Sequence, residues 1–260
     1  MAKVPTILFM MVVVLVDPIH GAPQVPCFFI FGDSLVDNGN NNNLLTRAKV
    51  NYQPYGIGID FLTGPTGRFC NGRTTVDILA QLLGFENLIP PFATSNKGPD
   101  ILKGLNYASG ATGIRVETGS QLGGHISLDQ QLLNHQVTAI LYTYKKKKNT
   151  TSPDEISSAQ VHRPMPTKKS MPTKFRRGKP NPANFVGIDL CRRNFVARVN
   201  NIGQCAAGQT PCQNRSEYVF WDGFHPTEAL NQITGIRTYT AFDPSDAYPM
   251  GISHLVQLRL

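Results

Sequence analysis

The chain has 260 residues, of which 41% are hydrophobic and 16% charged, a composition typical of a globular protein with one sizeable core. Its formal net charge of +8 is concentrated in one segment, because 11 of the 25 Lys and Arg residues lie between positions 145 and 179. This segment is rich in proline and has one aromatic residue, Phe175, so it lacks the folded basic face with aromatics that nucleic-acid binding uses. We therefore expect no nucleic-acid partner.

The beginning of the chain is typical of a secretory signal. A lysine precedes an apolar run at residues 7–16, and small residues follow at Gly21 and Ala22. The run is too short to span a bilayer, so we interpret residues 1–22 as a cleaved signal peptide. Residues 23–260 are then expected to form a single exported, extracellular domain without a stable membrane anchor.

The first expected element of this domain is a short buried strand at residues 28–31. It ends at Gly32, Asp33 and Ser34, an arrangement that lifts polar side chains to the rim of a sheet. The alternative is a plain strand followed by an asparagine-rich turn. Residues 51–71 contain many Gly, Pro and aromatic residues and are expected to run irregularly over the surface.

Helices and strands then alternate. Thr74 or Thr75 can cap a helix that closes at Gly84, a second short strand is expected from Asn106, and a second helix is expected over residues 127–139. Alternation of this kind favours an α/β layer fold with a parallel sheet.

Regular periodicity stops at residues 142–184, a basic tract with scattered prolines that interrupts the domain. Beyond it, strands are expected at residues 185–190 and 217–221 and a helix at residues 227–237. The inward-facing residues of this last helix are expected to be Ala229, Leu230, Ile233 and Ile236.

The cysteines become interpretable in an exported protein, where thiols can pair. There are five, so at least one is left over. Cys205 and Cys212 are separated by a short loop that suits a local disulfide better than a metal site, and no CxxC or HExxH motif predicts a metal. Asn149 and Asn214 each begin an N-glycosylation acceptor motif.

The sequence YVFWDGFHPTEA near the C-terminus has the spacing of an oriented general base. Asp222 precedes His225 by three residues, so the carboxylate can hold one imidazole nitrogen while the other faces a partner. A serine hydroxyl needs such a base to become a nucleophile, and Ser34 would complete a Ser-His-Asp triad. The alternative is that His225 caps its helix and Asp222 accepts backbone hydrogen bonds.

Four blocks together carry a resemblance: FGDSLVDNGNNN, GPTGRFCNGRTTVDILAQLLG, LNYASGATGI and YVFWDGFHPTEALNQI. In this order they resemble the plant GDSL esterase/lipase family of the SGNH hydrolase superfamily. The resemblance implies a three-layer α/β/α fold with a parallel sheet and hydrolysis of small-molecule or lipid esters without metal or cofactor. It implies Ser34 as nucleophile, His225 as base and Asp222 as its orienting acid.

The resemblance also implies an oxyanion hole made by the backbone N–H groups of Ser34 and Gly110 and by an asparagine side chain from a Gly-x-Asn-Asp block. No Asn-Asp dipeptide occurs in this sequence, and the basic tract lies where the block belongs. Loss of one oxyanion donor costs roughly 10²- to 10³-fold in kcat. Because the basic tract lies where this block belongs, the fold is also expected to be incomplete in its middle.

Three functions follow from these observations. The first is a secreted carboxylic-ester hydrolase with a Ser-His-Asp triad. The second is a truncated, catalytically impaired or inactive relative, which a longer transcript across codons 137–198 would revise. The third is a basic binding module acting through residues 145–179, for which binding to anionic polymers would depend steeply on salt.

Overall fold

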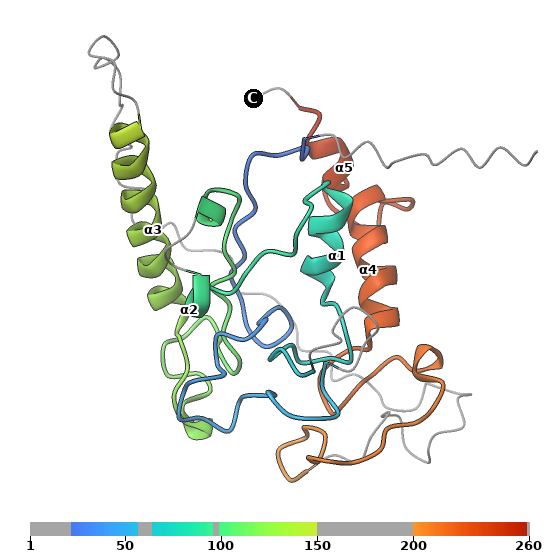
Figure 1. The fold of residues 1–260 in the computed structure, drawn as a ribbon. Helices are drawn as coiled ribbons and strands as arrows, with labels where there is room; N and C mark the ends of the chain where they lie inside the picture. The colour runs from blue at the N-terminus through green and yellow to red at the C-terminus, as the bar shows by residue number, and fades with distance from the viewer. Residues whose placement is uncertain (1–21, 57–63, 96–98, 150–199, 259–260) are drawn as a thin grey trace, which may run out of the picture.

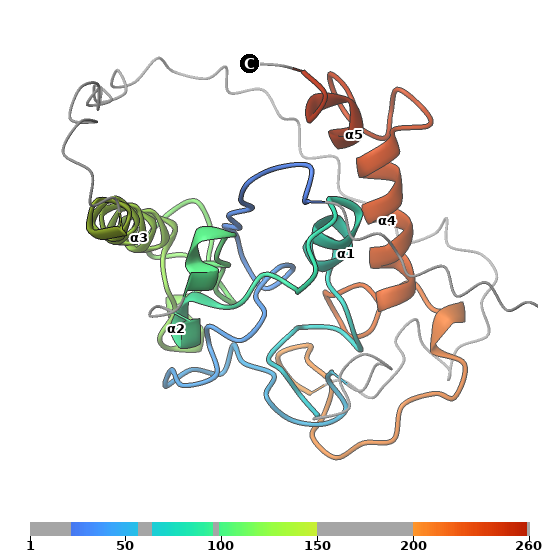
Figure 2. The same cartoon turned by 45° about the horizontal axis from the view of Figure 1, so that its top comes forward.

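The computed structural model describes residues 22–56, 64–95, 99–149 and 200–258 (Figure 1). Its helices are α1 (Thr75–Leu82), α2 (Phe92–Ser95), α3 (Leu128–Asn149), α4 (Glu228–Thr240) and α5 (Ile252–Leu255), with 3-10 turns at Pro99–Leu102, Ser120–Leu122 and Arg215–Glu217. Helices α1, α4 and α5 lie together on one side, α3 stands apart on the other, and long connecting segments run between them (Figures 1 and 2).

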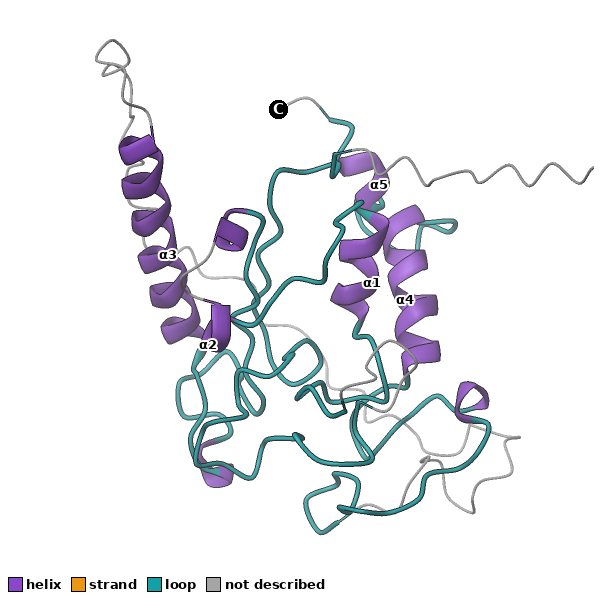
Figure 3. Ribbon diagram, in the orientation of Figure 1, coloured by secondary structure: helices purple, strands orange, loops and turns teal. Residues whose placement is uncertain are grey.

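In the described parts of the chain the expected sheet is represented by isolated pairings. Segment 28–32 runs parallel to segment 103–109, with hydrogen bonds from Ile30 N to Leu105 O (3.0 Å) and from Tyr107 N to Ile30 O (2.8 Å). Asn106 also pairs in parallel with Pro91. Within the described ranges no stretch is long enough to be a strand, so the parallel direction agrees with the prediction and the three-layer sheet is not confirmed (Figure 3).

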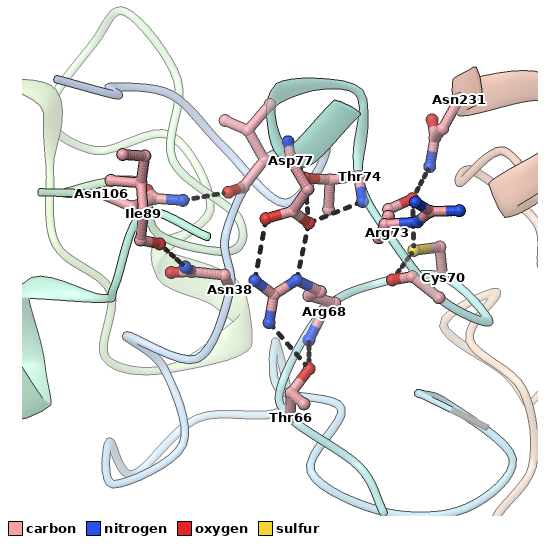
Figure 4. A network of polar contacts seen from close by, with 12 residues as sticks. Asn38, Thr66, Arg68, Cys70, Arg73, Thr74, Asp77, Ile89, Asn106 and Asn231 are labelled. Carbon is pink, nitrogen blue, oxygen red and sulfur yellow. Dashed lines mark hydrogen bonds and ion pairs between the residues drawn. The ribbon is translucent and has the colours of Figure 1, made fainter. Parts of the chain in front are cut away.

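Helix α1 forms where it was predicted because its first turn is closed by local polar contacts. Thr74 is the N-cap, and Thr74 and Asp77 form a reciprocal capping box. Asp77 also binds Arg68 through two hydrogen bonds of 2.7 and 2.9 Å, and the guanidinium continues to Thr66 (Figure 4). Gly84 follows the helix with a positive φ of 86°, as expected of a glycine that ends a helix.

Helix α3 extends ten residues beyond its predicted end at position 139, through the lysine run to Asn149. Lysine has good helix propensity, so an aperiodic hydrophobic pattern did not prevent helix formation there. The remainder of the predicted basic tract, and the expected strand at 185–190, lie outside the described residues.

Thr227, the first residue of the predicted range 227–237, is the N-cap of helix α4, but the inward face was predicted only in part. Ala229 and Leu230 are half-buried, as expected of that face. Ile233 and Ile236 are exposed, whereas Asn231 and Gly235 are buried. A Cβ at Gly235 would lie 2.7 Å from Ile78 Cγ2, so the missing side chain allows close packing of α4 on α1. The expected strand at 217–221 was also wrong, because Arg215–Glu217 is a 3-10 turn followed by irregular chain.

The predicted Cys205–Cys212 disulfide was wrong. Cys212 is disulfide-bonded, whereas Cys205 is a free, buried thiol, as is Cys70. Cys205 instead packs in a core cluster with Tyr55 and Trp221. Short spacing along the sequence therefore did not determine which thiols approach each other.

None of the described helices is both long enough and apolar enough to cross a membrane.

Candidate active site

Ser34 lies in a tight turn directly after the first paired segment. The backbone N–H of Asp37 donates to Asp33 O at 3.0 Å, and the N–H of Leu35 donates to the Asp33 side chain at 2.9 Å. Asn106 reaches across from the neighbouring segment and donates to Val36 O at 2.6 Å (Figure 4). These bonds present the Ser34 side chain at the end of the paired segments.

Helix α3 fixes this turn through one buried amide. Gln131 is fully buried, and its Oε1 accepts from Gly32 N at 3.0 Å while its Nε2 donates to Gly32 O at 2.9 Å. A side-chain amide can make this two-way contact with a peptide group because it carries a donor and an acceptor side by side. The residue two positions before Ser34 is therefore attached to a helix 99 residues away in sequence.

Asp222 and His225 lie in one short loop that is closed by its own backbone. Trp221 N donates to His225 O at 2.7 Å, and the N–H groups of Phe224 and His225 donate to Asp222 Oδ1 at 2.8 and 2.9 Å. Thr227 then caps the first turn of α4. The loop holds the carboxylate and the imidazole at a separation set by local geometry.

Ser34, His225 and Asp222 form a continuous hydrogen-bonded chain. The distance from Ser34 Oγ to His225 Nε2 is 2.8 Å, and both carboxylate oxygens of Asp222 are 2.8 Å from His225 Nδ1. Because Nδ1 faces a carboxylate, we assign the proton to Nδ1, which leaves Nε2 to accept the serine hydroxyl proton. The structure thus brings together the three residues predicted from sequence.

Ser34 and His225, at one end of this hydrogen-bonded chain, line a cleft of about 310 Å³. Asp222 is 0% and His225 4% exposed, so the acid and base are shielded from bulk water. The ring of Phe69 packs against His225 at a centroid distance of 4.9 Å. Most of the other lining residues are apolar: Leu35, Ala48, Ala111, Leu122, Ile202 and Phe224.

The backbone N–H of Gly110, predicted as an oxyanion donor, already has another hydrogen-bond acceptor. Gly110 N donates to Asp37 Oδ2 at 2.8 Å. Its neighbour Ala111 lines the cleft with Ser34 and has a left-handed φ of 70°. Among the residues that the structure describes, neither Ala111 N nor Ser34 N has a hydrogen-bond acceptor.

Asp37 connects this region to the serine turn. Its carboxylate accepts the N–H groups of Gly39, Asn40 and Gly110, each at 2.8 Å. Burial raises the pKa of Asp37 to about 6, although these three donors and the charge of Arg68 act to lower it. The charged and neutral forms of this carboxylate are therefore balanced at about pH 6 rather than near its ordinary value of 3.8.

Three residues of this region were missed by the sequence analysis. Tyr55 contacts Asp222 and lies in a stretch interpreted as irregular surface chain, and no local pattern distinguished Gln131 from other polar residues of its helix. Asp37 had a signal, since Asp before Asn-Gly-Asn is typical of a side chain that binds backbone N–H groups two and three residues later.

The predicted glycosylation positions lie away from these contacts. Asn214 is exposed at the start of the Arg215–Glu217 turn, and Asn149 is the last residue of α3. The other two positions of the Asn149 motif lie outside the described residues.

A serine, an imidazole and a buried carboxylate connected in this order are the arrangement used by serine hydrolases for nucleophilic attack on acyl compounds. Residues 28–159 match the family of GDSL-like lipases/acylhydrolases. The chain is 37% identical to the GDSL esterase/lipase At1g29670 of Arabidopsis thaliana, with 90% of this chain and 92% of the relative covered. It is 36% identical to At5g45670 of the same species, with 97% of this chain and 99% of the relative covered.

The chain therefore belongs to the GDSL-like lipase/acylhydrolase family, as predicted from its four sequence blocks. Family membership implies the SGNH hydrolase fold and an ester-hydrolase activity. No solved structure matches the chain.

The alignment with the first relative also shows that residues are missing here. It runs over 340 positions, whereas the whole chain has 260 residues, so at least 80 positions (340 less 260) have no counterpart in this chain. The relatives are therefore longer within the aligned region.

Proposed function

We propose that this chain is a secreted carboxylic-ester hydrolase in which Ser34 is the nucleophile. The observation that carries the proposal is the 2.8 Å contact between Ser34 Oγ and His225 Nε2, with Asp222 on the opposite side of the imidazole. Residues separated by 191 positions meet at hydrogen-bonding distance beside an apolar cleft. That arrangement suits attack on an ester with an apolar acyl group.

In the first step His225 Nε2 takes the proton from Ser34 as Oγ bonds to the acyl carbon of the ester. The imidazolium that forms is stabilised by Asp222 and then gives its proton to the leaving alcohol. A water molecule, deprotonated by the same nitrogen, attacks the acyl-serine, and the nitrogen returns this proton to Ser34 Oγ as the bond between Oγ and the acyl carbon breaks and the acid leaves. Every proton transfer uses one nitrogen, His225 Nε2.

The negative oxygen of the tetrahedral intermediate needs donors close to Ser34. We propose the backbone N–H groups of Ser34 and Ala111 for this role, in place of the Ser34 and Gly110 pair expected from sequence. The reason is that Gly110 N already donates to Asp37, whereas Ala111 lines the cleft. A third donor, the asparagine of the family's Gly-x-Asn-Asp block, has no counterpart in the sequence.

A slow enzyme is the second candidate function. A hole with two donors is expected to lower kcat by roughly 10²- to 10³-fold relative to one with three. The aligned positions of the relative that have no counterpart in this chain support this alternative. A longer transcript that restores a Gly-x-Asn-Asp block would remove the ground for it.

The test is hydrolysis of short-chain p-nitrophenyl esters by the full chain, with the variants Ser34→Ala and Ser95→Ala. Ser95 is the control because its hydroxyl contacts only Thr94 among the described side chains. We expect Ser34→Ala to lose all hydrolysis above background and Ser95→Ala to retain the wild-type rate. Equal rates for wild type and Ser34→Ala would exclude Ser34 as the nucleophile.

Labelling with a fluorophosphonate separates a slow enzyme from an inactive one. The reagent forms a phosphorus–oxygen bond with an activated serine and releases fluoride, so it reports the triad without requiring turnover. Labelling at Ser34 together with a low kcat would support the two-donor enzyme. Absence of labelling would leave an inactive relative.

Secretion and glycosylation belong to the same proposal. The signal-like residues 1–22 support export, and exposed Asn214 is accessible to a glycan. Expression in a eukaryotic host should release the protein into the medium with a mass that falls after glycan removal. Retention inside the cell would contradict export.

A further inference from the structure

Tyr55 is the one side chain outside the triad that contacts the Asp222 carboxylate in the described part of the chain. Its hydroxyl lies 2.5 Å from Asp222 Oδ2. The Tyr55 hydroxyl oxygen also accepts the backbone N–H of Cys205 at 2.8 Å. Because Cys205 N can only donate, the hydroxyl proton is free to point to the carboxylate, and Tyr55 acts as a donor to Asp222.

The two oxygens of Asp222 are held by different groups. Oδ1 receives the backbone N–H groups of Phe224 and His225, both from the loop of Asp222 itself. Oδ2 receives the hydroxyl of Tyr55, from a segment 167 positions away. Asp222 is 0% exposed, so water is not a ready substitute for the tyrosine. The plane of the carboxylate is thus fixed on one side by local backbone and on the other by Tyr55.

Tyr55 is itself rigidly packed. It is fully buried, and its ring makes edge contacts with Trp221 at 6.4 Å and Tyr52 at 5.4 Å between centroids. Burial and the nearby Asp222 charge raise the pKa of Tyr55 above its ordinary value, so the hydroxyl keeps its proton throughout the working pH range. A neutral donor in a fixed ring suits an orienting role.

We propose that Tyr55 is a positioning residue for catalysis, which holds Asp222 in the orientation that aligns His225 with Ser34. This inference rests on the proposed function. It extends the hydrogen-bonded chain by one residue, from Ser34 through His225 and Asp222 to Tyr55, and joins the segment after the serine turn to the C-terminal loop. Without this donor the carboxylate would be held only at Oδ1 by its own loop, and its Oδ2 side could shift and change the alignment of the imidazole.

The test compares Tyr55→Phe with Tyr52→Phe in the full chain. Both variants remove one hydroxyl from the same aromatic cluster. Tyr52 is the matched control because its hydroxyl contacts Gln204 Oε1 and Cys205 O and no triad residue. Thermal unfolding of each variant checks that the cluster remains folded.

We expect Tyr55→Phe to lower kcat by about 10- to 100-fold with little change in KM, the size expected for a lost hydrogen bond to a charged group. We also expect the acid limb of kcat/KM to move to higher pH, because the carboxylate charge facing the imidazolium is no longer shared with a hydroxyl. The titratable groups that face the Asp222 carboxylate are Tyr52, Tyr55, Cys205 and His225. Tyr52→Phe should match the wild type in both measurements.

The same comparison is made with the rate of fluorophosphonate labelling of Ser34 against pH, which does not depend on rapid turnover. The downfield proton resonance of His225 Nδ1 gives a third measurement, since a changed Asp222 contact shifts it. A lower rate with an unmoved acid limb, or an equal loss in Tyr52→Phe, would make Tyr55 merely structural and overturn the proposal. So would wild-type behaviour of Tyr55→Phe.

Failure of this inference is distinguishable from failure of the proposed function. If Ser34→Ala loses activity and labelling while Tyr55→Phe behaves as wild type, the hydrolase proposal stands and the role of Tyr55 falls. If Ser34→Ala retains both, the hydrolase proposal itself falls, and the role of Tyr55 falls with it.

Discussion

Ala111 lines the same cleft as Ser34 and has a backbone conformation that is unfavourable for a residue with a side chain. Its φ of 70° belongs to the left-handed region, where a Cβ costs about 1–2 kcal/mol. Gly119 makes the conformation sterically possible, since a Cβ there would lie 2.0 Å from Ala111 O. A strained residue at a cleft wall is consistent with its proposed use as a backbone donor.

Substitution of Ala111 tests this use. We expect Ala111→Gly to keep or raise kcat, since glycine adopts this φ without strain. Ala111→Val should lower stability by about 1–3 kcal/mol and lower kcat, because a β-branched residue resists this conformation and would displace the N–H. Ester hydrolysis and urea unfolding measure the two effects. Equal kcat values for the two variants would argue against Ala111 as an oxyanion donor.

At the scale of elements, α3 holds the serine turn through the buried side chain of Gln131. Gln131 provides the acceptor for Gly32 N and a donor to Gly32 O, from within a helix whose outer residues are largely exposed. The position of the serine turn therefore depends on where α3 lies. This makes a helix that contributes no reacting group important for the geometry of the site.

We expect Gln131→Ala to destabilise the fold by about 2–4 kcal/mol, because it leaves a cavity and removes the acceptor of Gly32 N. We also expect a lower kcat, since Ser34 is two residues from Gly32. Gln130→Ala is the control, because Gln130 is an exposed neighbour whose side chain contacts Asn134 on the same helix. Urea unfolding and ester hydrolysis provide the measurements. Comparable losses in both variants would indicate a general effect on α3.

The elements also differ in how well they could be predicted. Helix α1 could be predicted because its signals are local: a threonine that can cap it and Gly84 that ends it. The structure adds the reciprocal contact of Thr74 with Asp77, three residues away. The buried face of α4 was not fully predicted, because Gly235 is selected by the approach of Ile78 from α1. Parallel pairing of segment 28–32 with segment 103–109 requires contacts over more than 70 positions, so its extent could not be derived from local pattern.

For the molecule as a whole, the buried Asp37 carboxylate connects stability to pH. Its folded pKa of about 6 lies above the ordinary value of 3.8, so the folded state keeps a proton that the unfolded state loses between these values. The free energy of unfolding therefore falls as pH rises from about 4 to about 6. The raised pKa of Asp37 contributes about 3 kcal/mol to the free energy of unfolding, at 1.36 kcal/mol per pH unit. This contribution is fully present below pH 3.8 and absent well above pH 6.

Asp37→Asn tests this coupling, because the amide does not titrate and retains one oxygen for the Gly39 and Asn40 N–H groups. We expect the difference in unfolding free energy between wild type and Asp37→Asn to grow in favour of wild type as pH is lowered from about 6 to about 4. Urea unfolding at a series of pH values measures it. A difference that stays constant over this interval would contradict the prediction.

The amino-acid sequence by itself determined the family and the helix starts near Thr74 and Thr227, and it predicted Ser34, Asp222 and His225 as a triad, because each of these inferences depends on local patterns of residue types. Tertiary structure alone decided that Ser34 and His225 meet at 2.8 Å, that Gly110 binds Asp37, and that Cys205 remains a free thiol. The contacts of Tyr55 with Asp222 and of Gln131 with Gly32 were also identified only from the tertiary structure. The physical reason is that these contacts join segments distant along the chain, and buried polar groups take whichever partner the packing of the whole molecule brings within reach.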